Sequence, residues 1–169
     1  MREITIKVYQ YSELSEKAKE RARHWYLEGL DTYYVWEDLK ADAKSVGLIL
    51  YGTNNRGNMK GGFEKSAEDC AKRIIAEHGE KCETYKTAAK FVEDRKKIFS
   101  AHADDECETG LTFKGDNALG ELEDEFLCEI CEDYRINLEK EYEYQSSEEC
   151  ITENMAANEY EFDENGRRI

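Results

Sequence analysis

The sequence LGELEDEFLCEICEDYRINLEKEYEY, from Leu119 to Tyr144, predicts the longest helix of the chain. Its apolar residues recur every three or four positions, which places them on one face of an α-helix. That face consists of Leu119, Leu122, Phe126, Ile130, Tyr134, Leu138 and Tyr142, with Leu127 and Cys131 alongside. Acidic residues crowd the remaining positions. The segment therefore predicts an amphipathic helix with a buried apolar side and a strongly acidic exposed side.

The residues that follow this helix predict a short helix and an edge strand. Ser147 is a suitable N-cap for a helix that ends at Ala157. Tyr160 and Phe162 alternate with acidic residues, as in a strand with one buried face. Residues 163–166, with the sequence DENG, then predict a turn.

The residues that precede the long helix predict further helices, a strand and a hairpin. Alternating apolar and polar residues predict the strand, and two short runs flanking an Asn- and Gly-rich segment predict the hairpin. The helices follow from apolar residues at helical spacing, N-capping residues and C-terminal glycines. The predicted segments are the strand Ile4–Val8, a helix from Ser12 or Ser15 to Gly29, a helix from Asp31 or Thr32 to Gly47, the hairpin strands Leu48–Thr53 and Met59–Phe63, a helix from Ser66 to His78, a helix Glu83–Ala103 and an acidic loop from Ala103 to Gly115.

These segments predict an α+β fold, with a helical majority of about six helices, one of them short, on a small antiparallel sheet of three to four strands. We expect Ile4–Val8, Leu48–Thr53 and Met59–Phe63 to form one sheet, and the N-terminal and C-terminal strands to share a sheet. The chain has 169 residues, 40% of them hydrophobic, which suffices for one modest core. A single domain over residues 1–169 is the simplest interpretation.

The charge of the chain is unevenly distributed. Lys and Arg number 24 and Asp and Glu number 39, which gives a net charge of −15. Residues 1–103 carry a net charge of +2 and form a near-neutral part. Residues 104–164 hold 22 acidic residues against Lys114, Arg135 and Lys140, a net charge of −19. Because nucleic acids and anionic membranes are bound by basic surfaces, we expect no direct binding of this chain to either.

The sequence also indicates where the protein acts. No run approaches the ~18 apolar residues of a membrane span, so we expect no membrane association. The first ten residues include Arg2, Glu3 and Lys7 and lack an apolar block, so we expect no signal peptide. Without that signal, the six cysteines do not imply a disulfide framework. A cytoplasmic location is the resulting prediction.

Residue patterns typical of enzymes and cofactor sites are missing from the sequence. Cys128 and Cys131 are the one metal-like pair, but a structural zinc site normally has two pairs of ligands. We therefore expect these cysteines to be small core residues and predict no metal and no cofactor, although zinc binding stays open as an alternative. His24, His78 and His102 have no evident catalytic partner. The chain is predicted not to be an enzyme.

The acidic side of the long helix and the acidic loop are the candidate binding surface. One interpretation is that these carboxylates only keep the protein soluble. The other is that they take the place of nucleic-acid phosphates in binding a basic partner. Like charges one turn apart repel, so we expect the fold to tolerate substitution of Glu125, Glu129 and Glu132 by Lys, which reverses their charge. The candidate residues are Glu121, Glu123, Asp124, Glu125, Glu129, Glu132 and Asp133 on the helix, and Asp104, Asp105 and Glu106 in the loop.

Two stretches of the chain resemble small acidic proteins encoded by bacteriophages and prophages, mostly of unassigned function, and the resemblance extends over most of the chain. They are Glu13–Arg23, after a short strand, and the tail that runs from Glu139–Tyr144 through Ala157–Phe162. The resemblance implies a phage accessory protein in the cytoplasm of a bacterial host. Several such proteins inhibit CRISPR or restriction systems, often through acidic surfaces that resemble nucleic acid. The resemblance assigns no functional residues.

Two functional hypotheses follow. The leading one is a phage-encoded inhibitor of bacterial immunity, specifically an anti-CRISPR protein, that binds the basic groove of a defence effector. The alternative is a phage regulatory or antitoxin-like module that interacts with other proteins through its aromatic residues. Those residues are Trp25, Tyr26, Tyr33, Tyr34 and Trp36. The sequence leaves open which effector is bound and in which oligomeric state.

Overall fold

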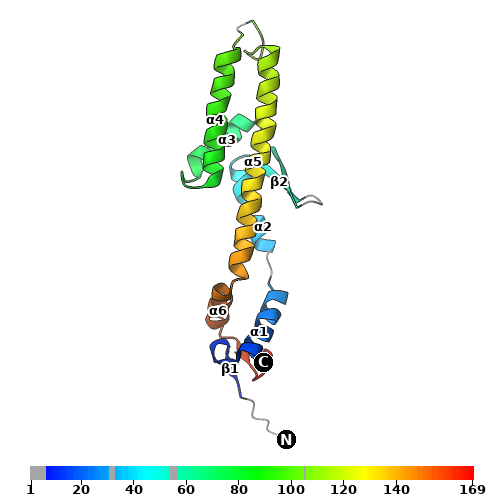
Figure 1. Cartoon of the computed structure of the whole chain (residues 1–169), viewed down its shortest axis with the longest axis vertical. Coiled ribbons are helices and arrows are strands. Elements are labelled where there is room, and N and C mark those ends of the chain that lie inside the picture. The colour runs from blue at the N-terminus through cyan, green and yellow to red at the C-terminus, as the bar shows by residue number, and fades with distance from the viewer. Residues whose placement is uncertain (1–6, 31–32, 54–56, 105) are drawn as a thin grey trace. The chain divides into compact units, whose positions relative to one another are not determined.

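The fold is α+β with a helical majority, as the sequence predicts. The structure is a computed structural model that describes residues 7–30, 33–53, 57–104 and 106–169 (Figure 1). The helices are α1 (Glu16–Glu28), α2 (Tyr33–Ser45), α3 (Ala67–Glu77), α4 (Glu83–His102), α5 (Phe113–Gln145) and α6 (Glu148–Ala157), with a 3₁₀ turn η1 (Tyr11–Glu13). The strands are β1 (Tyr9–Gln10), β2 (Leu48–Thr53), β3 (Met59–Phe63) and β4 (Glu161–Phe162).

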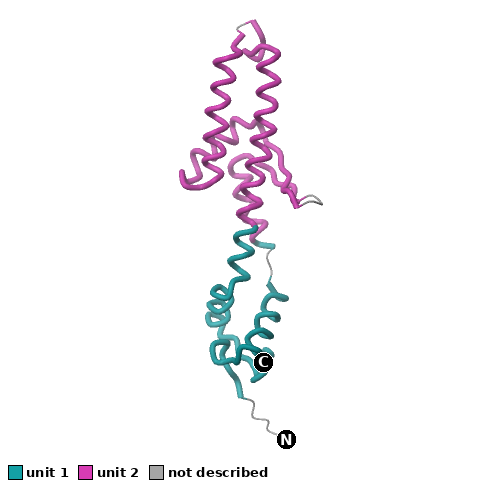
Figure 2. Tube along the Cα trace, viewed as in Figure 1, with its two compact units in different colours: residues 1–34, 139–169 teal, residues 35–138 magenta. Residues whose placement is uncertain are grey.

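The chain divides into two compact units, which Figure 2 shows in different colours. The terminal unit comprises residues 1–34 and 139–169, and the central unit comprises residues 35–138. Each unit has its own cluster of buried hydrophobic residues. A domain is defined by cooperative unfolding as well as by compactness, so the single domain over residues 1–169 stays a prediction.

The strands form two separate antiparallel pairs, so the single sheet expected from the sequence is wrong. β1 pairs with β4, which confirms that the N-terminal and C-terminal strands share a sheet. β2 pairs with β3 in the predicted hairpin. Of the predicted strand Ile4–Val8, residues 4–6 lie outside the described residues and Val8 is exposed and outside β1. β1 ends at Gln10 because its N–H donates to the Glu13 carboxylate and the chain turns into η1.

The core of the terminal unit forms around Phe162 of β4. Ala18 and Ala22 of α1 and Ile151 and Met155 of α6 are buried in the same cluster. The small alanines allow close approach of the surrounding elements, as their position on the predicted apolar side of α1 suggests. The ring of Trp25 then meets the edges of Tyr160 and Phe162, with centroids 5.3 and 6.0 Å apart.

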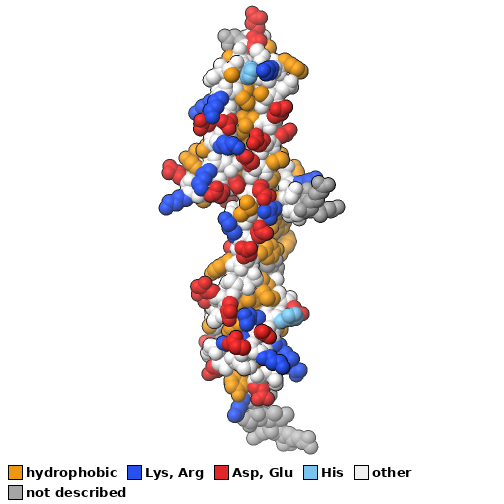
Figure 3. All heavy atoms as spheres, viewed as in Figure 1, with side chains coloured by type: hydrophobic (Ala, Val, Ile, Leu, Met, Phe, Trp, Pro, Cys, Tyr) orange, Lys and Arg blue, Asp and Glu red, His pale blue; other side chains and the backbone are white. Residues whose placement is uncertain are grey.

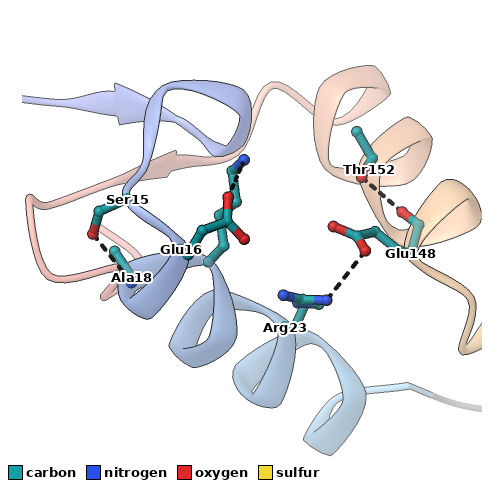
Figure 4. Close-up of polar contacts among 7 residues, drawn as sticks. Ser15, Glu16, Ala18, Arg23, Glu148 and Thr152 are labelled. Atoms are coloured by element: carbon teal, nitrogen blue, oxygen red, sulfur yellow. Dashed lines mark hydrogen bonds and ion pairs between the residues drawn. The ribbon is translucent and has the colours of Figure 1, made fainter.

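Polar contacts join α1 to α6 within the terminal unit (Figure 4). The Ser15 hydroxyl accepts a hydrogen bond from the Ala18 N–H and caps α1, so Ser15 and not Ser12 is the N-cap. Arg23 of α1 lies 3.4 Å from the Glu148 carboxylate in the first turn of α6. A carboxylate at this end of a helix also interacts favourably with the helix dipole. One acidic residue of the C-terminal part is therefore paired inside the protein.

The core of the central unit forms around Phe126 of α5. Its ring stacks on Phe91 of α4 and Phe63 of β3, with centroids 4.4 and 5.6 Å apart. Ile130 and Tyr134 of α5 are buried in the same cluster. These three α5 residues are the centre of the predicted apolar side of the long helix, and their burial confirms the prediction there, whereas Tyr142 near the end of that side is 42% exposed.

Helix α5 also lies directly against strand β3 of the hairpin. A Cβ atom at Gly61 would lie 2.7 Å from the Ile49 carbonyl oxygen and 2.9 Å from the Cys131 sulfur. Real Cβ atoms do not approach other atoms so closely, so only glycine allows this packing.

Helix α5 begins at Phe113 and not at the predicted Leu119. The Thr112 hydroxyl accepts a hydrogen bond from the Gly115 N–H and thus caps the helix. A Cβ atom at Gly115 would lie 2.7 Å from Cβ of His102 at the end of α4. Glycine is therefore required here by packing, although in the sequence it lowers the helix propensity of this turn.

Candidate functional site

Two of the predicted binding residues face α4 and hold a lysine. Nζ of Lys90 lies 2.9 Å from Glu129 and 3.7 Å from Glu125. The hydrogen bond that Lys90 donates to Glu129 raises the pKa of Lys90 above its usual value. Both carboxylates therefore form ion pairs within the protein, between α5 and α4. Substituting both residues by Lys would place two new ammonium groups beside that of Lys90. The expectation that charge reversal at these positions relieves repulsion is therefore wrong.

Two further predicted residues also have internal partners. The Thr87 hydroxyl of α4 donates a 2.7 Å hydrogen bond to Asp133. Burial raises the pKa of Asp133, although this hydrogen bond opposes the effect. Glu132 forms a bidentate ion pair with Arg135, whose guanidinium donates two hydrogen bonds of 2.8 Å to the carboxylate. The hydrogen bonds from Arg135 lower the pKa of Glu132.

The remaining three predicted binding residues on α5 have no ion pair among the residues that the structure describes. They are Glu121, Glu123 and Asp124, which we call the acidic patch. Glu121 and Asp124 are exposed, and Glu123 is half-buried. Residues three positions apart share a helix face, so the two exposed carboxylates point to the same side. They are free to meet a cation of another molecule.

The acidic loop contributes less than the sequence suggests. The Asp104 carboxylate accepts a hydrogen bond from the Glu106 N–H at 3.1 Å and one from the Cys107 thiol at 3.3 Å. This side chain therefore closes a turn of its own loop. Glu106 is exposed, and Asp105 lies outside the described residues.

Basic side chains interrupt the acidic surface. On the face that Figure 3 shows, Lys and Arg lie among Asp and Glu over both units. Between α4 and α5 lies an open hollow of about 530 Å³, lined by residues of both signs. Its lining is Lys86, Thr87, Lys90, Cys128, Glu129, Glu132 and Asp133. Lys90 of α4 thus balances part of the charge on α5 locally.

The two cysteines of α5 have different surroundings. Cys131 is buried, as predicted, and burial raises the pKa of its thiol to about 11. Cys128 is exposed, so its interpretation as a core residue is wrong. Within the described part of the chain, no group of three His, Cys, Asp or Glu side chains is placed to hold a metal ion.

A polar cluster that the sequence did not indicate joins α2 to α4 and α5. The Tyr134 hydroxyl donates a 2.6 Å hydrogen bond to Asp42, and Nε2 of His78 lies 3.7 Å from the same carboxylate. Nδ1 of His78 lies 2.8 Å from the Thr84 hydroxyl oxygen. Burial, followed by the hydrogen bond to Asp42, raises the pKa of Tyr134. Thr84 is only 4% exposed, which leaves a substrate little access to its hydroxyl.

The aromatic residues of the alternative hypothesis divide between the two cores and the surface. Trp25 and Tyr26 pack against the core of the terminal unit, and Trp36 packs against that of the central unit. Tyr33 and Tyr34 are 66% and 49% exposed. Most of the proposed aromatic surface is therefore engaged in folding.

Comparisons with known proteins supply no assignment. No protein-family model matches the chain, and neither a curated protein nor a solved structure matches it. Among the described residues, every helix is too short or too polar to cross a lipid bilayer.

Proposed function

We propose that this chain inhibits a bacterial defence system without catalysis, by occupying the basic nucleic-acid groove of an effector such as a CRISPR nuclease. The supporting observation is the acidic patch on α5, whose carboxylates lack ion pairs within the described structure. Binding a cation through them breaks no internal salt bridge. Glu125, Glu129 and Glu132, by contrast, would first have to leave Lys90 or Arg135.

The overall charge supports the same proposal. Residues 104–164 carry a net charge of −19, and such a field attracts a basic surface over a distance. Attraction of this kind raises the association rate and weakens with salt, because the Debye length is about 10 Å at 0.1 M. The narrower assignment to a phage anti-CRISPR protein rests on the resemblance of the chain to phage accessory proteins.

An infection assay tests this function. The chain is expressed in bacteria with an active CRISPR or restriction system, and the cells are infected with a phage that the system normally restricts. We expect the wild-type protein to restore plaque formation. The double variant Glu121→Lys/Asp124→Lys should lose this effect by about tenfold or more, because two carboxylates become cations that repel the effector.

A matched double variant separates the acidic patch from net charge. Asp38 and Glu80 are exposed and have no ion pair within the described residues. Asp38→Lys/Glu80→Lys raises the net charge from −15 to −11, as the patch variant does. We expect it to protect the phage like the wild type. Equal loss in both variants, or full protection by the patch variant, would contradict the assignment to the patch.

A further inference from the structure

Helix α5 has one long face that the described part of the chain leaves uncovered. Residues three or four positions apart lie on the same side of a helix. Six residues linked by this spacing are all exposed, and we call them the open face. They are Phe113, Asn117, Gly120, Glu121, Asp124 and Cys128. No side chain on the open face makes a hydrogen bond, an ion pair or a ring contact within the described residues.

Phe113 lies at one end of the open face and is 81% exposed, more than any other large hydrophobic side chain in the described chain. The Thr112 hydroxyl accepts a hydrogen bond from the Gly115 N–H and caps this end of α5. The Thr112 N–H also donates to the His102 carbonyl oxygen of α4 at 2.9 Å. The phenyl ring is therefore held in solvent by an ordered backbone, and the fold gains little from its apolar surface.

The free carboxylates of the open face form a single row. Glu121 and Asp124 are about 5 Å apart along the helix axis, at a rise of 1.5 Å per residue. The neighbouring carboxylates Glu125 and Glu129 are bound by Lys90 of α4. Free negative charge on this face is thus confined to one line, as in a single nucleic-acid strand. A duplex has two such lines, one for each backbone.

We propose that the open face occupies an effector channel that holds single-stranded nucleic acid. This inference rests on the proposed function and names the kind of groove that the protein fills. Channels for a single strand combine basic groups that follow the phosphates with aromatic side chains on which bases stack. Glu121 and Asp124 take the place of phosphates, and the Phe113 ring takes the place of a base.

The length of the open face fits a channel of this kind. Phe113 and Asp124 are about 17 Å apart along the axis of α5. One strand rises about 3.4 Å per nucleotide, so this distance corresponds to about five nucleotides. Sites for a single strand typically hold about 4–16 nucleotides.

A groove for duplex DNA would leave Phe113 without a partner. A duplex presents phosphates and base edges to a protein, while its base faces are stacked inside. Such a groove therefore needs no platform on which a ring can stack. The carboxylates of the open face alone would suit either kind of groove, so the exposed ring decides between them.

Infection of two bacterial strains that express the full chain tests the proposal. One strain carries a CRISPR nuclease that holds a displaced single strand, and the other carries a restriction endonuclease that binds duplex DNA. We expect the protein to restore plaque formation in the CRISPR strain only. Protection in the restriction strain would overturn the single-strand assignment but not the proposed inhibition. Protection in neither strain would overturn both.

Variants of Phe113 in the CRISPR strain test the stacking. Phe113→Ala should lower plaque formation by about tenfold, since the loss of one aromatic stack weakens binding by about that factor. Phe113→Trp keeps a stacking ring and should protect the phage like the wild type. Phe113→Leu keeps apolar bulk without a ring and should lose as much protection as Phe113→Ala. Full protection by Phe113→Leu would show an apolar anchor instead and overturn the proposal.

A second exposed aromatic residue provides the matched control. Tyr51 of β2 is 68% exposed and belongs to the same compact unit as Phe113. Tyr51→Ala should protect the phage like the wild type, and circular dichroism should show little change in the thermal midpoint of either alanine variant. Equal loss of protection in both would contradict the role of Phe113. Loss in Glu121→Lys/Asp124→Lys with full protection by Phe113→Ala would support the inhibition and overturn the single-strand channel.

Discussion

Two neighbouring carboxylates on α5 affect stability with opposite signs. Burial raises the pKa of Asp133, so its ionisation is less favourable in the folded protein than in the unfolded chain. Its ionic form therefore costs stability at neutral pH, and the cost disappears below the unfolded pKa of about 4. The hydrogen bonds from Arg135 lower the pKa of Glu132, so ionisation of Glu132 adds stability that is lost as the pH falls through its folded pKa.

We therefore predict that Asp133→Asn raises the thermal midpoint at pH 7, because the amide oxygen still accepts the Thr87 hydrogen bond without a buried charge. The adjacent variant Glu132→Gln should lower the midpoint slightly at pH 7, by the few tenths of a kcal/mol typical of exposed pairs. Both differences should shrink at pH 3. Circular dichroism melts at the two pH values measure them, and a lower midpoint for Asp133→Asn at pH 7 contradicts the assignment.

At the scale of elements, the C-terminal turn is packed on α1 through one glycine. Gly166 has a φ of +76°, and a Cβ atom there would lie 2.0 Å from the Ala18 carbonyl oxygen. This oxygen belongs to the helix backbone and has little freedom to move. The predicted turn at 163–166 is confirmed by the 3.0 Å hydrogen bond from the Gly166 N–H to the Asp163 carbonyl oxygen. Its packing was not evident from the sequence.

We predict that Gly166→Ala destabilises the protein by about 2–4 kcal/mol, through left-handed backbone strain plus overpacking. The control is Gly110→Ala, at a φ of +72° with no atom within 4 Å of the new Cβ. That variant should lose only the stability that left-handed backbone strain removes, about 1–2 kcal/mol. Urea unfolding of both variants measures the difference. Equal losses would show that contact with α1 is unimportant.

At the scale of the whole molecule, the two cores share no buried residue among those described. Each core also has its own tryptophan, Trp25 in the terminal unit and Trp36 in the central unit. The two units can therefore be followed separately by fluorescence in the single-tryptophan variants Trp36→Phe and Trp25→Phe.

We predict that Phe162→Ala, which empties the centre of the terminal core, costs about 3–5 kcal/mol there. The urea midpoint reported by Trp25 should fall further than the midpoint reported by Trp36. The reverse pattern is expected for Phe126→Ala, at the centre of the other core. Equal shifts of both midpoints would instead establish one cooperative domain over residues 1–169.

Much of the secondary structure was predictable because its signals are local. Ser15, Ser66 and Ser147 each accept the expected hydrogen bond from an N–H three residues later. A cap needs only a hydroxyl and the following turn, so neighbouring residues contain the whole signal. The α5 apolar side and the β2–β3 hairpin were predictable for the same reason, since periodicity reflects which residues share a face.

The contacts between distant residues were not predictable in this way. The pairing of β1 with β4 and the bonds of Lys90 to Glu125 and Glu129 depend on segments far apart in the chain. The sequence alone determined which segments become helices and where acidic residues accumulate. Folding in three dimensions determined which carboxylates have internal partners, because an ion pair acts over a few ångströms regardless of separation along the chain.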